Sequence, residues 1–323
     1  MNQGYPRLLG DIGGTNARWA WQESAGAGLE DISVRACQDH ASIEESARQY
    51  LHDHGRARPA WAGIGIATAL AGDEVQLTNS SWRFSIAAFQ KALGLERCLF
   101  VNDFTALALS LPALAAAELR PVGGGCAVPG MAIALLGPGT GLGVSGLVPD
   151  AVGGYSALSG EGGHMTLAAA DDAQAALLSL LRKKFDHVSA ERVLCGEGLV
   201  NVYQALCVLA GQVPRALEPS DVTDAAIAGS DPQCVLAVTH FTRFLGQVAG
   251  NLALMLGARG GVYIGGGVVP RLGAAFDEGL FRQCFENKGR FRPWLEAVPV
   301  WVITASTPAL VGASRALDTQ TWR

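Results

Sequence analysis

Apolar residues along this chain form two kinds of segment, short continuous runs and longer stretches in which they recur three and four positions apart. Short runs bounded by glycine turns are typical of strands, and the longer spacing is typical of helices. The two kinds alternate, which predicts an α/β chain whose second half is the more helical. The expected strands lie within 7–21 and at 60–67, 99–101, 131–136, 142–148, 261–264 and 298–304, and the expected helices at 42–54, 85–93, 104–111, 171–185, 189–210, 231–256 and from 310 onward.

Two glycine-rich turns interrupt this pattern, GDIGGTN from Gly10 to Asn16 and GPGTGLG from Gly137 to Gly143. Each joins two strand-like runs, so both are predicted to be hairpin tips. Glycine lets the backbone approach phosphate oxygens with several amide N–H groups directed at one anion, and Thr15 and Thr140 add a hydroxyl donor to each tip. The repeated unit indicates a duplicated architecture with a polyphosphate ligand between its halves.

Other nucleotide-binding patterns fit less well. The string GxxxxGK[ST] of a P-loop does not occur. The spacing GxGxxG occurs at Gly141, Gly143 and Gly146, but it lies inside a strand-like run and opens no helix. A dinucleotide-binding fold is therefore not expected.

Length and charge narrow the function classes. A chain of 323 residues is expected to hold about two domains, and Pro112 with the Gly- and Pro-rich loop 121–130 places the boundary near residue 112. The net charge is −5 and no cluster of Lys and Arg compensates it, so nucleic acid is not an expected partner. The seven cysteines are scattered without a CxxC pair, as in reduced cytosolic proteins, and the N-terminal residues lack the pattern of a signal peptide.

The most apolar long segment, 235–257, is expected to be a buried helix and not a membrane span. It carries His240, Arg243, Gln247 and Asn251 at spacings of three and four, which place one polar stripe on an otherwise apolar helix. No membrane association is expected.

Motifs in order along nearly the whole chain resemble those of the bacterial glucokinase family, in the hexokinase branch of the actin-like ATPase fold. They are GDIGGTNAR, TNSSWRFS, VNDFTA, GPGTGLGV, GEGGH, HVSAERVL, AGNLAL, GGVYIGGGVVPR and ENKGRF. The resemblance implies an α/β, two-domain actin-like ATPase (ribonuclease H-like) fold with the active site in the interdomain cleft. The small α/β domain would comprise residues 1–112 with about 305–323, and the large α/β domain residues 113–304.

Asp103 is the expected general base. Without the resemblance, Asn102 and Asp103 would be interpreted as a helix N-cap, and both interpretations can hold together. A carboxylate at a helix N-terminus is stabilised as the anion, which makes it a weak base. A weak base suffices in phosphoryl transfer, because the hydroxyl proton leaves late in a loose transition state.

The sugar hydroxyls are expected to be bound by polar side chains from several motifs. Glu161 and His164 have the spacing of a di-iron motif, but that motif needs a helix, and the two glycines between them favour a loop. Zinc is the other alternative, since a related group of repressors and kinases binds it with a cysteine cluster, which this chain lacks. The resemblance assigns the sugar to Asn102, Asp103, Glu161, His164 and Glu191, with Asn79 as a further residue of the sugar side.

Purely structural interpretations of these residues stay open. Glu191 follows Ser189, a natural N-cap, so it can be an acidic residue in the first turn of a helix. Asn79 can be a turn residue and Trp82 a core side chain.

ATP and Mg²⁺ are the implied cofactors. Asp11, at the end of the first strand, is expected to orient Mg²⁺ through water, because phosphate-bound Mg²⁺ keeps several waters. The residues expected to bind the nucleotide are Gly10, Asp11, Ile12, Gly13, Gly14 and Thr15 from the first turn, Gly139, Thr140 and Gly141 from the second, and Gly265 and Gly266 from the turn after strand 261–264.

We therefore expect a cytoplasmic glucokinase that transfers the γ-phosphoryl group of ATP to the 6-hydroxyl of D-glucose. The resemblance also implies that the protein is a homodimer. Three alternatives are a kinase for another hexose, a filament-forming actin-like ATPase, and a sugar-sensing repressor. The repressor would need a helix-turn-helix before GDIGGTN, where only nine residues stand. Two departures from the family pattern are Ala69, where relatives carry a proline, and Cys195-Gly196-Glu197-Gly198 in place of SGPG.

Overall fold

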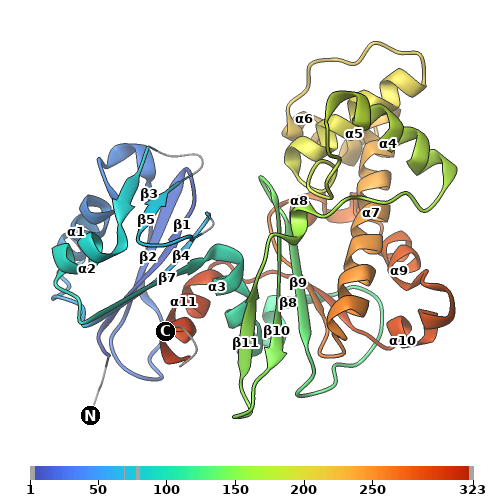
Figure 1. The fold of residues 1–323 in the computed structure, drawn as a ribbon. Coiled ribbons are helices and arrows are strands. Elements are labelled where there is room, and N and C mark those ends of the chain that lie inside the picture. The colour runs from blue at the N-terminus through green and yellow to red at the C-terminus, as the bar shows by residue number, and fades with distance from the viewer. Residues whose placement is uncertain (1–3, 69, 78–80, 320–323) are drawn as a thin grey trace. The chain divides into compact units, whose positions relative to one another are not determined.

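The computed structural model describes residues 4–68, 70–77 and 81–319, which divide into two compact units. Unit 1 comprises Met1–Ala115, Tyr155–Ser159 and Ala305–Arg323, and unit 2 comprises Ala116–Gly154 and Gly160–Thr304. Each unit combines helices with a mixed sheet (Figure 1). The α/β class predicted from the alternation of strands and helices is confirmed.

The sheet of unit 1 has the strand order β3-β2-β1-β4-β7. Its first two strands form an antiparallel hairpin, and β4 and β7 lie parallel to β1. Ile12 is in register with Ile66, and Ile66 with Asn102, so the three parallel strands end at one level of the sheet. The strands of this unit are β1 (Arg7–Ile12), β2 (Asn16–Gln22), β3 (Glu30–Ala36), β4 (Trp61–Ile66), the small ribbon β5 (Glu74–Gln76) and β6 (Arg83–Ser85), β7 (Arg97–Asn102) and β11 (Tyr155–Ser159).

Helices cover both faces of this sheet because apolar residues alternate along the hairpin. Leu8 packs into the cluster formed with α1 (Ile43–Asp53) and α2 (Ile86–Leu93), whereas Leu9 faces the opposite side and packs with α11 (Pro308–Asp318). The last helix is also tied to the first strand by Arg7, which donates to Asp318 at 2.5 Å. The C-terminal helix thus packs on the first strand of unit 1.

Helix α3 (Asp103–Ser110) and α11 approach each other closely at Gly312. A β-carbon at this position would overlap the carbonyl oxygen of Ala106 on α3. We therefore expect Gly312→Ala to lower the free energy of unfolding by about 1–3 kcal/mol, since overlap with backbone cannot be relieved by a rotamer change. Gly124→Ala, where a β-carbon meets open space, is the control. Thermal unfolding followed by circular dichroism measures both variants, and equal melting temperatures would contradict the close contact.

Unit 2 repeats the strand arrangement of unit 1. The hairpin of β9 (Ile133–Pro138) and β10 (Leu142–Pro149) is antiparallel, and β12 (Val262–Ile264) lies parallel to β9. Beyond β12 lies β13 (Val300–Ile303), again parallel, with β8 (Leu119–Pro121) antiparallel at the edge. Both glycine turns are hairpin tips, as the sequence predicts.

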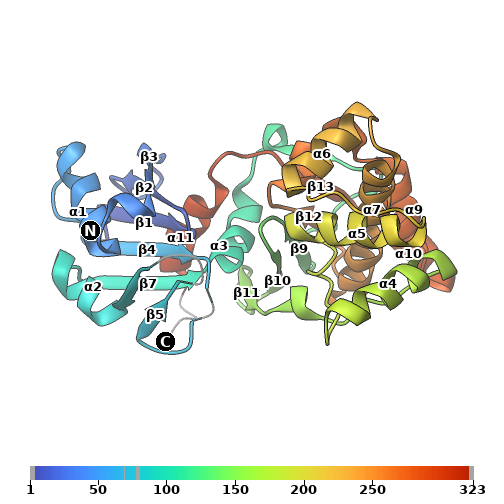
Figure 2. The same ribbon diagram turned by 90° about the horizontal axis from the view of Figure 1, so that it is seen from above.

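The long helix α7 (Pro232–Leu256) is the centre of unit 2, where it packs against α5, α6, α9 and β9 (Figure 2). Phe241, Phe244 and Leu245 are fully buried in the core of this unit. Within the described residues, no helix has both the length and the apolar character that crossing a bilayer requires. The other helices of the unit are α4 (Asp172–Lys184), α5 (Gly196–Leu209), α6 (Pro219–Ala228), α8 (Val268–Leu272), α9 (Glu278–Glu286) and α10 (Arg292–Glu296).

The helix predicted to start at Ser189 begins only at Gly196. Ser189 instead pairs with Thr166 in a β-bridge, and the following residues form a turn. The N-cap is Cys195, whose Sγ accepts from Gly198 N at 3.2 Å. The interpretation of Glu191 as a residue in the first turn of a helix is therefore wrong.

Candidate active site

The first glycine turn is shorter than its motif. β1 continues through Gly10, Asp11 and Ile12, and only 13–15 form the tip, which Gly13 N closes by donating to Asn16 O at 2.9 Å. Gly10 lies inside the sheet, opposite Trp19. Because the Gly13 amide is used within the tip, the amide groups that can face a ligand at this turn belong to Gly14 and Thr15.

Asp11 is paired with Arg18 across the hairpin. The two residues are opposite each other in the antiparallel register, and Arg18 Nη1 lies 3.2 Å from Asp11 Oδ2. Burial raises the pKa of Asp11 above its ordinary value, and the charge and hydrogen bond of Arg18 oppose that rise. A cation bound at this carboxylate would also favour the ionised form.

Asn102 and Asp103 stand where β7 passes into α3. Asn102 is the N-cap, with Oδ1 accepting from Phe104 N at 2.9 Å and Thr105 N at 3.2 Å. Asp103 is the first residue of the helix, and its Oδ1 accepts from Phe104 N at 2.8 Å. The helix start therefore fixes the backbone of both residues.

Within unit 1, Asp103 lies close to the first glycine turn. Gly65 on β4 lies between Asp103 and Gly10, the first residue of the GDIGGTN motif. A β-carbon added at Gly65 would lie 3.7 Å from Asp103 Cα and 3.8 Å from Gly10 O. The carboxyl ends of parallel strands form one edge of a sheet, where α/β proteins bind ligands. Asp11, the tip 13–15, Asn102 and Asp103 are thus brought together at this edge.

The second glycine turn is the meeting point of three segments of unit 2. Gly139 N donates to Gly141 O at 2.8 Å within the tip, and Gly196 N at the start of α5 donates to Gly139 O at 2.9 Å. The turn after β12 joins them, because Gly265 N donates to Leu136 O at 2.9 Å. Gly266 has a φ of 75° and packs directly on Pro138, where a β-carbon would overlap the Pro138 carbonyl.

Glu191 holds this second tip. Its Oε2 accepts from Leu142 N at 2.8 Å, and its own amide donates to Gly163 O at 2.9 Å. One residue therefore connects the glycine turn with the GEGGH loop. This contact could not be predicted from local patterns, because the segments are far apart along the chain.

Glu161 precedes the single 3₁₀ turn Gly162–His164, which His164 ends, and both side chains are exposed. His164 N donates to Glu161 O at 3.0 Å. The α-helix that a di-iron Glu-x-x-His motif requires is not formed here. In the part of the chain that the structure describes, no group of three His, Cys, Asp or Glu side chains is placed to hold a metal ion.

Some residues of the sequence prediction lie elsewhere. Asn79 and Ala69 are outside the described residues. Trp82 is a core side chain, as its structural interpretation predicted: it is 2% exposed, and its Nε1 donates to His40 O at 3.0 Å. Arg18 was missed: it lies opposite Asp11 because the hairpin pairs Ile12 with Ala17 across the tip.

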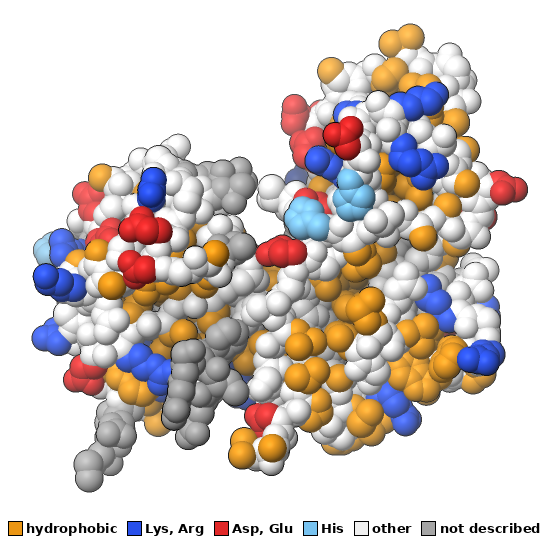
Figure 3. Space-filling model, viewed as in Figure 1, with side chains coloured by type: hydrophobic (Ala, Val, Ile, Leu, Met, Phe, Trp, Pro, Cys, Tyr) orange, Lys and Arg blue, Asp and Glu red, His pale blue; other side chains and the backbone are white. Residues whose placement is uncertain are grey.

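The distribution of charged side chains on the surface is consistent with the modest net charge of the chain. On the face drawn in Figure 3, Lys and Arg side chains are distributed among acidic and uncharged ones.

Several solved structures that are similar to this chain are sugar kinases. The crystal structure of glucokinase from an Antarctic psychrotroph is 35% identical, with a TM-score of 0.89 over 97% of this chain and 98% of that one. A ROK family glucokinase from Streptomyces griseus, solved in complex with glucose and AMPPNP, shares the fold with a TM-score of 0.64 at 19% identity, over 96% of this chain and 98% of that one. At 35% identity over nearly the whole length of both chains, the first of these structures places the chain in the class of sugar kinases.

Sequence comparison defines the family. The glucokinase family model matches residues 8–320. The glucokinase of Aromatoleum aromaticum is 52% identical over 97% of this chain and 95% of its own length. The chain belongs to the glucokinase family.

Proposed function

We propose that this protein is an ATP-dependent glucokinase, which transfers the γ-phosphoryl group of ATP to the 6-hydroxyl of D-glucose. The observation that carries the proposal is the match to the glucokinase family over residues 8–320, together with 52% identity to a curated glucokinase. β1 and β7 end at one level, which brings Asp11, proposed for the phosphate side, and Asp103, proposed as the base, to the same edge of one sheet.

We infer a two-domain actin-like ATPase fold. One domain comprises residues 1–112 with about 305–323, the other comprises residues 113–304, and the substrates would bind between them. The repeated hairpin followed by two parallel strands in each unit supports a duplicated fold. In this arrangement both hairpin tips hold one triphosphate, and closure around the sugar excludes water from the transferring phosphoryl group.

Asp103 is proposed as the general base that takes the proton of the sugar 6-hydroxyl. The N-cap Asn102 supports this role, because it fixes the backbone at the start of α3. Carboxylates accept hydrogen bonds and a neutral imidazole can donate one, so Glu161, His164 and Glu191 together can distinguish hydroxyl patterns. Asn102 and Asn79 complete the proposed sugar side.

The nucleotide phosphates are assigned to the two tips, 13–15 for the γ-phosphate and 139–141 for the β-phosphate, with Gly265 and Gly266 toward the adenosine. Asp11 fits a Mg²⁺ that enters with the nucleotide, since Arg18 engages only Oδ2 and burial makes a nearby cation favourable. The ion would neutralise phosphate charge when bound. Arg18 then keeps the carboxylate oriented.

Steady-state assays across a hexose panel test the substrate. We expect glucose to give a higher kcat/KM than mannose or an amino sugar, because each misplaced hydroxyl leaves polar groups of the site unpaired. A 2-deoxy analogue should lose up to about 10⁴-fold. Another hexose exceeding glucose tenfold would contradict the substrate assignment and leave the kinase class intact.

The same preparation tests the actin-like ATPase alternative. We expect ADP release that depends on glucose and a small sedimenting species, whereas ATP hydrolysis without sugar by a polymer would contradict the kinase. A homodimer and a cytoplasmic location are further proposals that rest on the family resemblance. Sedimentation velocity measures the first, and cell fractionation the second.

A further inference from the structure

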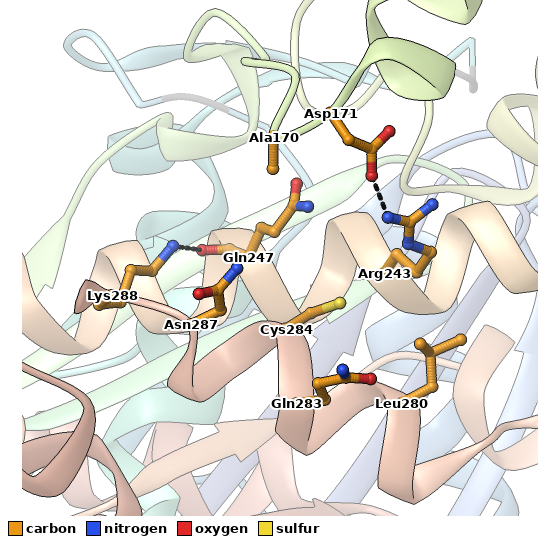
Figure 4. A pocket seen from close by; sticks show the side chains of 9 residues that line it. All are labelled: Ala170, Asp171, Arg243, Gln247, Leu280, Gln283, Cys284, Asn287 and Lys288. Carbon is orange, nitrogen blue, oxygen red and sulfur yellow. Dashed lines mark hydrogen bonds and ion pairs between the residues drawn. The ribbon is translucent and has the colours of Figure 1, made fainter.

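A polar cavity of about 420 Å³ lies inside unit 2 and contains no residue assigned to the candidate active site (Figure 4). One wall is the polar stripe of α7, and the facing wall is α9 with the segment after it. The loop before α4 carries Ala170 and Asp171, which lie above the two helices in Figure 4. The lining residues are Ala170, Asp171, Arg243, Gln247, Leu280, Gln283, Cys284, Asn287 and Lys288.

The lining carries an excess of positive charge. Arg243 and Lys288 supply two cations and Asp171 one anion, and the ion pair joins Arg243 Nη2 to Asp171 Oδ2. Lys288 is half-buried, and the one hydrogen bond of its ammonium within residues 4–68, 70–77 and 81–319 goes to Gln247 O at 3.2 Å. An ammonium has three donors, so two of those on Lys288 remain for a ligand.

Burial lowers the pKa of Lys288 below its ordinary value, and the Cys284 thiol opposes this. Partial burial of an ammonium without a carboxylate partner carries a desolvation free-energy penalty, and a bound anion would offset that penalty. Arg243 adds a planar guanidinium whose fork matches phosphate oxygens, while Asp171 fixes its orientation.

Neutral polar groups complete the lining. Gln283 and Asn287 carry amides that can both donate and accept. Gln247 donates from Nε2 to Gln174 Oε1 at 3.1 Å, while its Oε1 is buried without a partner among the described residues. The volume falls within the range of about 300–1,000 Å³ typical of small-molecule sites. There is room for a phosphate group with a short polyol attached.

We propose that this cavity binds a small phosphate monoester, with the phosphate on Lys288 and Arg243 and the ester hydroxyls on the amides of Gln283 and Asn287. The site is separate from the proposed phosphoryl-transfer chemistry. It goes beyond the proposed function, and its failure would leave the kinase assignment untouched.

Cys284 lines the cavity and reports on its occupancy. The rate at which iodoacetamide alkylates Cys284 is measured by mass spectrometry of the peptides, with glycerol 3-phosphate as the probe and sodium chloride at equal ionic strength as the reference. AMPPNP and glucose are present throughout. At ten times its dissociation constant the probe should slow alkylation about tenfold. Cys126, which is exposed and outside the cavity, should react at an unchanged rate.

Variants of Lys288 test the binding residue. Lys288→Gln should abolish the protection, Lys288→Arg should retain most of it, and the control Lys91→Gln on α2 should behave as the parent protein. Unchanged thermal unfolding establishes that the variants are folded. Protection that persists in Lys288→Gln, or that sodium chloride reproduces, would overturn the site. Equal protection by inorganic phosphate would overturn the ester and leave the free ion as the ligand.

Discussion

Asp103→Asn is expected to lower kcat by about 10²- to 10⁴-fold, the range that a positioned base contributes. Asparagine cannot accept the hydroxyl proton, but its Oδ1 can still accept from Phe104 N as the aspartate does at 2.8 Å. The start of α3 should therefore survive the change. Glucose binding, measured by isothermal titration calorimetry, should persist in weakened form, and a near-normal turnover number would refute the assigned base.

Asp172 provides a matched control for this variant. It is the first residue of α4 after the N-cap Asp171, just as Asp103 is the first residue of α3 after Asn102. Asp172→Asn removes the same charge from the same helix position on an exposed side chain. We expect its kcat to match that of the parent protein, with stability changed by no more than about 0.5 kcal/mol. An equal loss in both variants would assign the effect to helix starts and not to proton transfer.

Local signals predicted much of the fold. Ser42 and Ser85 mark the starts of α1 and α2 because their hydroxyls accept from the third following amide, which is a short-range interaction. The glycine turns marked both hairpins for the same reason. The edge strand β3 was missed, because Ile32 and Val34 alternate with polar residues but remain 45% and 58% exposed, so no strong apolar run identifies it.

The start of α5 shows where local signals fail. Ser189 has the better N-cap side chain, yet a β-bridge to Thr166 takes its backbone out of the helix, and the thiol of Cys195 caps instead. That bridge is a contact between segments 23 residues apart, which no local pattern contains. In the candidate site, β1, β4 and β7 end at one level, which brings Asp11 and Asn102 to the same edge of the sheet. Both residues were predicted at strand ends, but the order of the strands was not predicted. The contact of Glu191 with Leu142 depends on tertiary packing, and it was not predicted from the sequence.

Glu191→Ala is expected to weaken nucleotide binding as well as sugar binding. Removing the carboxylate leaves Leu142 N, in a buried residue at the second glycine turn, without its acceptor. An unsatisfied buried amide costs about 1–3 kcal/mol, which corresponds to about 5- to 150-fold in an equilibrium constant. AMPPNP and glucose dissociation constants from calorimetry should therefore both rise, and kcat should fall with them.

Glu191→Gln separates the two roles of this side chain. The carbonyl oxygen of glutamine can accept from Leu142 N, so the turn should keep its position and AMPPNP should bind nearly as in the parent protein. The lost negative charge should still weaken the acceptance of sugar hydroxyls, because hydrogen bonds to ionised groups are about twice as strong as those between neutral groups. The KM for glucose should rise while that for ATP changes little. Glu197→Gln, an exposed acid in the first turn of α5, should change neither constant. If the alanine variant bound AMPPNP as tightly as the glutamine variant, Glu191 would contact only the sugar, and the hydrogen bond at 2.8 Å would have no part in positioning the phosphate turn.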